Sequence, residues 1–321
     1  MISAFKKRSF ISPVFALFLA ILAVSTASLL IRFAQREVPS LVIAAYRLSL
    51  ASIITVVFTL PRYYNEIRQL KRNQVFLAVL SGIFLAFHFA AWITSLELTS
   101  VTSSVVLVTT TPIWVSLLSP LILKEKINLR VMIYLGIALL GSVVVIFSKS
   151  CAITNRSLIC AIPATSKGEG NLLGNALALL GAFMAAGYVI SGRNLRKSIN
   201  LLPYTLLVYS IASVVLLILC FLFKYPLVGF SVQSYIWLIL LAIVPQILGH
   251  TTLNWALGFI PAVFVSIALL GEPVGSSLLA WVFLEEPPSL VEITGGMIIL
   301  LGIILSSRLM NKTKNGLSDG K

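Results

Sequence analysis

The sequence is poor in charged residues, and above all in acidic ones. Only 11% of its 321 residues are charged and only 10 are Asp or Glu, whereas a soluble domain carries about 25% charged residues. Apolar residues reach 59%, which is more than the interior of a globule of this size can hold. This balance excludes a soluble enzyme, a disordered chain and a coiled coil. It predicts an all-α protein that crosses a membrane several times.

Histidine and cysteine are also scarce, with two and three copies. Three cysteines are too few for a disulfide scaffold, and two histidines without a third ligand at metal spacing predict no metal site. No other cofactor is expected. Cys151 and Cys160 share a loop predicted to lie outside, where a disulfide between them is geometrically feasible, whereas Cys220 is expected inside an apolar span.

Long runs without Asp, Glu, Lys or Arg dominate the sequence. At about 1.5 Å per residue, roughly 20 apolar residues cross a bilayer core. Six such runs cover 10–31, 73–96, 98–123, 131–148, 170–192 and 198–223. The uncharged stretch 225–271 is long enough for two crossings and turns at 258–261, and spans 41–60, 262–284 and 288–307 tolerate one charge each. Together these segments predict ten transmembrane helices.

The basic residues set the orientation of these spans. If the N-terminus is inside, 17 of the 24 Lys and Arg residues fall in cytoplasmic segments and six in external ones, while Arg47 lies within a span. This asymmetry follows the positive-inside rule and predicts that both termini are cytoplasmic. It also explains the net charge of +14 without nucleic acid, because the bases are distributed between apolar runs rather than gathered in one patch.

The two halves of the sequence repeat each other. Pro112 recurs as Pro273 about 160 residues later, and His88 recurs as His250. A unit of five helices is odd, so the second copy must enter the membrane from the opposite face. Inverted repeats of this kind are typical of secondary transporters. We expect a first repeat at 14–148, an external linker at 149–172, a second repeat at 173–307 and a cytoplasmic tail at 308–321.

The motifs of both halves carry a family resemblance. The second half contains GHTTLNWAL at 249–257, LGEPV at 270–274 and LAWVFLEE at 279–286, and the first contains AYR at 45–47, TPIW at 111–114 and KEK at 124–126. Their ordered pairing resembles the two EamA domains of the drug/metabolite transporter superfamily. The resemblance implies ten helices in two inverted five-helix halves and export or exchange of small metabolites such as amino acids. It also implies a cavity lined mainly by helices 1, 3, 4, 6, 8 and 9.

Glu272 is the most informative candidate for the transport site. It lies near the middle of its span, where an ionised carboxylate is costly and usually functional, and Pro273 is expected to interrupt the helix beside it. Thr111 and Pro112 occupy the matching place in the first half. Glu272 therefore either titrates a proton or binds a substrate amine, or it holds a bend as a hydrogen-bonded structural residue.

The two histidines are candidates for cavity walls, because both fall inside apolar spans. Trp92 follows His88 by four residues and Asn254 follows His250 by four, so each pair shares a helix face. These side chains either stack on and hydrogen-bond to a substrate or hold neighbouring helices together. Trp114 and Tyr188 complete the list of cavity candidates. Arg47 lies near the outer end of its span and is expected to snorkel to the surface or to pair with Glu97, with a gating role as the functional alternative.

The function most consistent with this pattern is secondary transport by alternating access, either proton-coupled or down the substrate gradient. A membrane-embedded enzyme is the alternative, but the sequence has no His-Glu-x-x-His or Gly-x-Ser-x-Gly motif, so no enzyme activity is expected. The sequence supplies no rings of like charge, which would support a passive channel. It also has no phosphate-binding loop, which an ATP-driven pump needs. We expect small-molecule substrates, lipids as partners, a monomer or homodimer, and a multi-pass protein of the inner cell membrane.

Overall fold

The computed structural model describes residues 12–98, 104, 107–125, 127–148, 151–154, 157–160, 172–284 and 290–316. The helices of the first half are α1 (Pro13–Ser25), α2 (Ala27–Ala34), α3 (Ser40–Arg68), α4 (Arg72–Leu98), α6 (Thr111–Ile122) and α7 (Leu129–Ser148). Those of the second half are α8 (Leu172–Leu195), α9 (Leu201–Leu222), α10 (Val232–Leu241), the π-helix η1 (Ala242–His250), α11 (Thr251–Ala256), α12 (Ala262–Leu269), α13 (Glu272–Leu284) and α14 (Leu290–Gly316).

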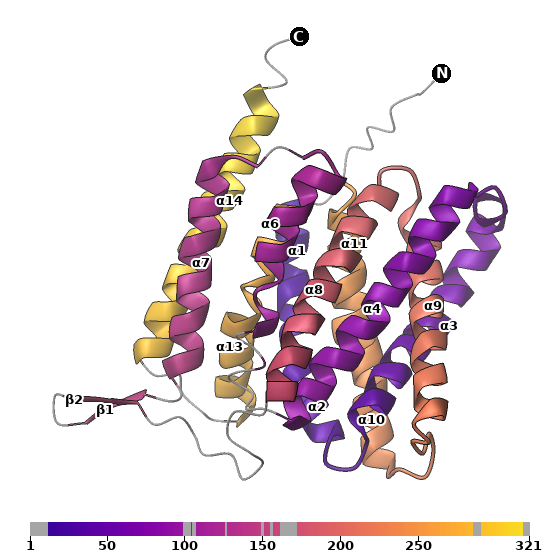
Figure 1. Cartoon of the computed structure of the whole chain (residues 1–321), viewed down its shortest axis with the longest axis horizontal. Coiled ribbons are helices and arrows are strands. Elements are labelled where there is room, and N and C mark those ends of the chain that lie inside the picture. The colour runs from indigo at the N-terminus through magenta and orange to yellow at the C-terminus, as the bar shows by residue number, and fades with distance from the viewer. Residues whose placement is uncertain are drawn as a thin grey trace.

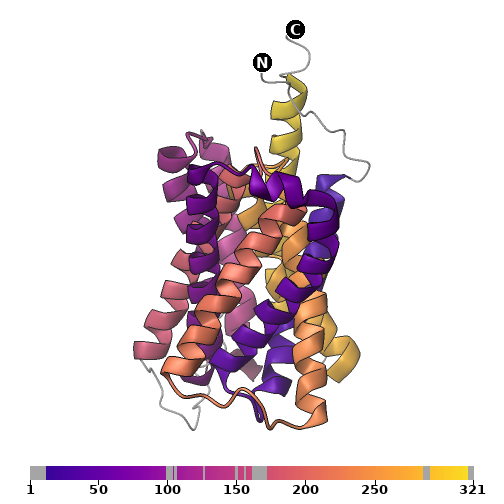
Figure 2. The ribbon, with the colours of Figure 1, turned by 90° about the vertical axis from the view of Figure 1, so that its right-hand side faces the viewer.

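The all-α prediction is confirmed, since nearly all the described residues are helical. Six segments of the described chain are long and apolar enough to cross a membrane, namely 13–34, 40–68, 72–98, 172–195, 201–222 and 232–256, and four shorter apolar helices accompany them. The helices run side by side, and α1 begins at the end of the bundle where α14 ends (Figures 1 and 2). We call this end cytoplasmic, following the distribution of basic residues.

The described residues add one element that the sequence did not predict. In the loop after α7, strand β1 (Cys151–Thr154) pairs with strand β2 (Ser157–Cys160) as an antiparallel hairpin. Its register places Cys151 opposite Cys160. The side chains of this hairpin lie outside the described part of the structure, so a disulfide between them stays a prediction. Cys220 is a buried free cysteine of α9, as expected.

The core lies between the two halves, because helices of one half pack against helices of the other. α3 packs along α9, and α4 packs along α8 (Figure 1). Serine pairs join α3 to α9 inside the bundle, with Ser49 Oγ 2.6 Å from Ser213 Oγ and Ser52 Oγ 2.7 Å from Ser210 Oγ. Small and hydroxyl-bearing residues hold membrane helices together in this way, because lipid offers them no other hydrogen-bond partner.

Carboxylate side chains from other segments cap the starts of four membrane helices. In each case a carboxylate oxygen accepts from a backbone N–H at the beginning of a helix, which satisfies a donor that the helix itself leaves free. The pairs are Glu37 with Ser231 (3.0 Å), Glu66 with Asn200 (2.9 Å), Glu97 with Ser40 (3.1 Å) and Glu125 with Ala262 (3.3 Å). We call these four side chains the capping carboxylates.

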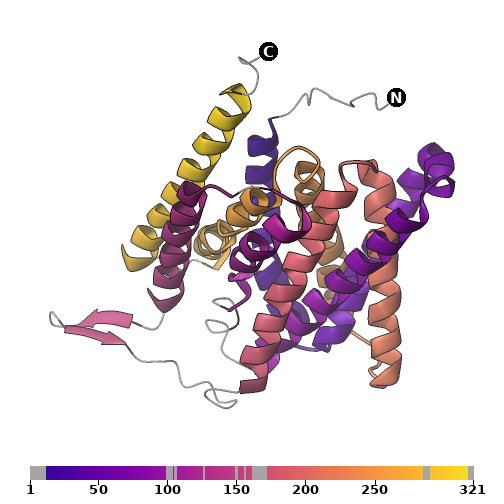
Figure 3. The same cartoon turned by 45° about the horizontal axis from the view of Figure 1, so that its top comes forward.

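Helices α7 and α14 form a closely packed pair at one edge of the bundle, seen on the left of Figure 1 and again in Figure 3. A Cβ atom added at Gly141 would lie 2.7 Å from the backbone nitrogen of Ile299 and 2.8 Å from the carbonyl oxygen of Gly295. Such distances require the two helices to move apart. Gly136 lies on the same helix, and a Cβ there would meet nothing within 4 Å.

We therefore expect Gly141→Ala to lower the free energy of unfolding by about 1–3 kcal/mol, because overpacking separates α7 from α14. Gly136→Ala is the matched control and is expected to be neutral or slightly stabilising, since alanine favours helix over glycine. Thermal unfolding of both variants in detergent measures the difference. Equal midpoints for the two variants would show that this close contact contributes nothing to stability.

Candidate functional site

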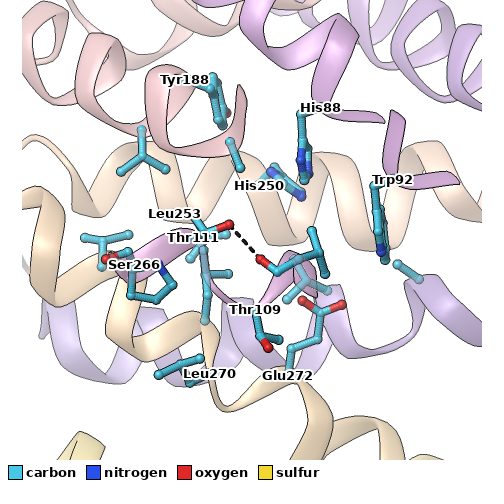
Figure 4. Close-up of a pocket in the computed structure, with 18 of the residues that line it drawn as sticks. His88, Trp92, Thr109, Thr111, Tyr188, His250, Leu253, Ser266, Leu270 and Glu272 are labelled. Atoms are coloured by element: carbon cyan, nitrogen blue, oxygen red, sulfur yellow. Dashed lines mark hydrogen bonds between the residues drawn. The ribbon is translucent and has the colours of Figure 1, made fainter. Parts of the chain in front are cut away.

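A central cavity lies where four membrane crossings depart from the regular α-helix. α1 gives way to α2 at Thr26, α6 starts after a turn at Thr109 and Thr110, α12 gives way to α13 at Leu270 and Gly271, and η1 lies between α10 and α11. Such departures occur inside membranes where backbone faces protein or a cavity. Lining residues from the two halves include Val24, Arg47, His88, Trp92, Thr109, Thr111, Tyr188, His250, Leu253, Asn254, Ser266, Leu270 and Glu272 (Figure 4).

Glu272 is the acidic residue among those lining the cavity, and its side chain points from the start of α13 into it (Figure 4). Its backbone carbonyl accepts from Ser25 Oγ at 3.1 Å, and Ser276 Oγ donates to the Ser25 carbonyl at 3.0 Å. The break before α13 is thus fixed to the break after α1. Pro273 lies in the first turn of the new helix, where its missing N–H is not needed, so the interruption falls before the proline, at Leu270 and Gly271.

His88 is a buried wall of the cavity. Its Nδ1 donates to the carbonyl of Gly181 on α8 at 2.9 Å, so Nε2 is left for another partner. Its ring stacks on Trp92 with centroids 6.0 Å apart and planes 8° from parallel. The indole Nε1 of Trp92 is buried without a partner among the described residues. This stacked pair presents one flat, apolar surface with unused polar atoms to whatever enters the cavity.

His250 lies on the opposite half, at the end of η1, and its ring packs 5.4 Å from Phe89 and 6.4 Å from Tyr188, measured between centroids. The Tyr188 hydroxyl donates to Asn254 Oδ1 at 2.8 Å. Asn254 Nδ2 lies 3.4 Å from the Tyr209 hydroxyl, which extends the network toward α9. His250 thus lies at the end of a π-helical segment, a departure from the α-helix that is rare and frequent at functional sites.

Arg47 corrects the sequence analysis. It was expected to reach the surface or to pair with Glu97, but its side chain is 0% exposed and lines the cavity. Its Nε donates to Gln246 Oε1 at 2.7 Å, and its guanidinium carbon lies 4.1 Å from the centre of the Phe89 ring. Glu97 instead accepts from Ser40, so both expectations for Arg47 were wrong. The single charge in an otherwise apolar span was the signal that could have indicated a functional role.

The remaining candidates separate into two groups. Thr111 lines the cavity, and its hydroxyl donates to the carbonyl of Val108 at 2.8 Å, which closes the turn before α6. Trp114 does not line it and packs edge-on against Phe183, 5.4 Å between centroids. Seven of the eight residues proposed from the sequence therefore surround one cavity. The described residues contain no group of three or more His, Cys, Asp or Glu side chains that could hold a metal ion.

Contacts join the two halves at both ends of the bundle. At the cytoplasmic end, Arg193 Nε donates to Glu125 Oε1 at 2.8 Å and its Nη1 donates to the carbonyl of Leu257 at 2.7 Å, while Glu125 also caps α12 at Ala262. We call Arg193 and Glu125 the cytoplasmic ion pair. At the external end, the Tyr46 hydroxyl donates to the carbonyl of Leu227 at 2.7 Å.

Glu37 adds a pH-sensitive contact at the external end. The hydroxyls of Ser231, at 2.7 Å, and then of Ser234 donate to its carboxylate and hold the pKa of Glu37 below its ordinary value of 4.5. Because the pKa is lowered, the contact stabilises the fold at pH values above the ordinary pKa. This stabilisation is lost as the pH falls through the pKa of the folded state.

We expect wild type to be more stable than Glu37→Gln at neutral pH. The difference should shrink as the pH falls below the ordinary value of 4.5 and vanish below the pKa of the folded state. Unfolding midpoints of both proteins across this range measure it. Glu97→Gln removes another capping carboxylate of the external end. Its unfolding midpoints across the same pH range show how a second cap responds to pH. A difference between wild type and Glu37→Gln that does not depend on pH would contradict the assignment.

Known proteins resemble this chain in both sequence and structure. The model of the EamA-like transporter family matches residues 11–147 and 172–308, once in each half. The uncharacterized transporter YdfC of Bacillus subtilis (strain 168) is 21% identical over 272 residues, which cover 84% of this chain and 82% of that protein. A protein crystal structure with 19% identity superimposes at a TM-score of 0.72, covering 94% of this chain and 98% of the other, which shows a shared fold.

Proposed function

This chain belongs to the EamA-like transporter family, and we propose that it exports or exchanges small organic metabolites, such as amino acids or related compounds, by alternating access. The family and the relative have transport in common. The observation that carries the finer proposal is the cavity, which lies between the halves at the breaks before α6 and α13. These are equivalent helices of the two repeats.

Alternating access requires contacts that can open at one end while they close at the other. The two ends of this bundle carry comparable contacts between the halves. Glu37 caps α10 at the external end, and Glu66 caps α9 at the cytoplasmic end, where the cytoplasmic ion pair lies as well. In our proposal the halves rock around the cavity, and these two sets of contacts break in turn.

We further propose that Glu272 couples transport to protons or binds a substrate amine, with His88, Trp92, His250 and Asn254 contacting the substrate. The inner cell membrane is the proposed location. The aromatic and imidazole rings offer stacking surfaces, and the carboxylate is the acidic group that the cavity offers. Sites of this kind, mostly apolar with a few polar groups, fit small organic molecules.

Uptake into proteoliposomes tests the proposal. A pooled panel of amino acids and other metabolites is offered with and without an imposed pH gradient, and the internal content is measured. Ala185→Trp fills the cavity and serves as the blocked control, whereas Leu179→Trp adds the same ring to the exposed face of the same helix. We expect uptake by wild type and Leu179→Trp, and none by Ala185→Trp. Uptake of no compound by folded wild type would contradict the proposal.

A further inference from the structure

The cavity contains more hydrogen-bond donors than its own residues can use. Both Nη atoms of Arg47, Nε1 of Trp92 and Nε2 of the adjoining Gln246 are buried without a partner among the described residues. All four are donors and cannot accept. A buried donor without an acceptor costs free energy, and a charged one costs more. The surplus favours a ligand that brings several acceptor oxygens and a negative charge.

The position of Arg47 determines which part of its side chain is available. Its Nε already donates to Gln246 Oε1 at 2.7 Å. The Phe89 ring, whose centre is 4.1 Å from the guanidinium carbon, covers one face of the guanidinium. The edge that carries the two Nη atoms remains, and neither atom hydrogen-bonds to Glu272. Two coplanar N–H groups at one edge match the two oxygens of a carboxylate.

The charges around Arg47 limit the ligand to one negative charge at this position. Arg47 is the basic side chain among the lining residues, apart from the two histidines, and Glu272 lines the same cavity. A doubly charged phosphate would face this carboxylate with a single arginine to balance it. A single carboxylate is matched by one guanidinium, and Glu272 remains for an amine or a proton.

We propose that Arg47 is the residue that binds the substrate's carboxylate, and that the transported compounds are therefore organic acids, with or without an amine. This inference rests on the proposed transport function and narrows its substrate class. Gln246 and Phe89 act as positioning residues, since one fixes Nε and the other stacks on the guanidinium. Trp92 Nε1 and Gln246 Nε2 are further donors for the same acceptor group.

Binding of matched acids and amides tests the assignment. Alanine, leucine, phenylalanine and threonine are each compared with their α-carboxamides, which keep the amine and side chain but lose the negative charge. Dissociation constants are measured on the purified full chain in detergent. For at least one pair we expect wild type to bind the acid about 10- to 100-fold more tightly than the amide, the range for hydrogen bonds to a charged group.

Arg47→Gln is expected to reduce this preference to about onefold and to leave amide binding unchanged. Gln246→Glu keeps the arginine but gives it a protein carboxylate, so it should weaken acid binding in the same way, and it serves as the second variant if Arg47→Gln does not fold. Arg32→Gln removes an exposed arginine on α2 and should preserve the preference. A structural role alone would lower the unfolding midpoint of Arg47→Gln without changing the ratio of acid to amide binding.

The outcomes separate this inference from the proposed function. No preference for the acid in any pair, whether both members bind or neither does, contradicts the role of Arg47. So does a preference that survives in both Arg47→Gln and Gln246→Glu. Acid preference in a wild type that moves none of these compounds into proteoliposomes contradicts transport instead, while Arg47 keeps its assignment. Equal transport of acids and amides contradicts the inference and leaves transport standing.

Discussion

Glu272→Gln is expected to abolish accumulation of substrate above equilibrium under an imposed pH gradient, so that the internal to external ratio falls to about one. Glutamine keeps the shape of the side chain and its hydrogen-bonding capacity but carries no titrating proton. The backbone contact between Ser25 and Glu272 is unaffected, so α13 keeps its start. Proteoliposome uptake with and without the gradient measures the effect.

Glu66→Gln is the matched control, because it removes a carboxylate that caps α9 away from the cavity. Glu66→Gln should still accumulate substrate above equilibrium. If Glu272→Gln still accumulates substrate, the coupling proton is carried elsewhere. If wild type itself only equilibrates and the variant behaves identically, the protein is a facilitator and Glu272 has a structural role.

The same variant shows whether Glu272 binds a substrate amine or carries only the coupling proton. If Glu272 binds a substrate amine, Glu272→Gln should weaken binding of phenylalanine and leave binding of 3-phenylpropanoate, which has no amine, unchanged. If it carries the coupling proton alone, both compounds should bind as before and only accumulation should be lost. Dissociation constants for the two compounds in both proteins decide between these readings.

Reversing one charge of the cytoplasmic ion pair is expected to cause the second large effect. Arg193 and Glu125 have side-chain exposures of 14% and 16%, so water screens them poorly. Arg193→Glu places two carboxylates together and removes the donor to Leu257. We expect a loss of stability of about 3 kcal/mol and at least a tenfold fall in initial uptake rate, since breaking a poorly hydrated ion pair is costly. Glu125 then keeps only the more exposed Lys197, whose Nζ lies 4.0 Å from Oε1.

The exchanged double variant, Arg193→Glu with Glu125→Arg, should recover part of both losses. Recovery should be incomplete, because the cap on α12 at Ala262 is lost with the Glu125 carboxylate. Lys71→Glu reverses an exposed charge at the same end and is the control. A double variant no better than the additive sum of the single changes would show that the two charges do not interact.

The fold was largely predictable because lipid leaves the chain few options. Each crossing must be a long apolar helix, so runs without charge located the helices, and the sequence repeat implied two halves. The helix breaks were less predictable. Prolines 112 and 273 pointed to the right region, but the interruptions fall just before them. The π-helical η1 contains Pro245, a signal that a proline inside a predicted helix distorts it.

The residue types of the site were predictable from the sequence, but the directions in which their side chains point were less so. His88 and His250 stood out because histidine is rare in an apolar span. Trp114 was placed in the cavity list, yet it packs on Phe183, because a helix that is apolar all round does not reveal which face is inward. Arg47 was expected at the surface because it lies near the outer end of its span, from which a long side chain can snorkel. Its actual partner, Gln246, lies 199 residues further along the chain.

The capping carboxylates make the two halves unequal during synthesis. Glu37, Glu66 and Glu125 belong to the half that is made first, yet each completes the start of a helix that is made later. The earlier half carries a cap of its own, because Glu97 on α4 caps the start of α3. Expressed as separate polypeptides, the first half should therefore accumulate in the membrane alone. The second should persist only when the first is present to receive it.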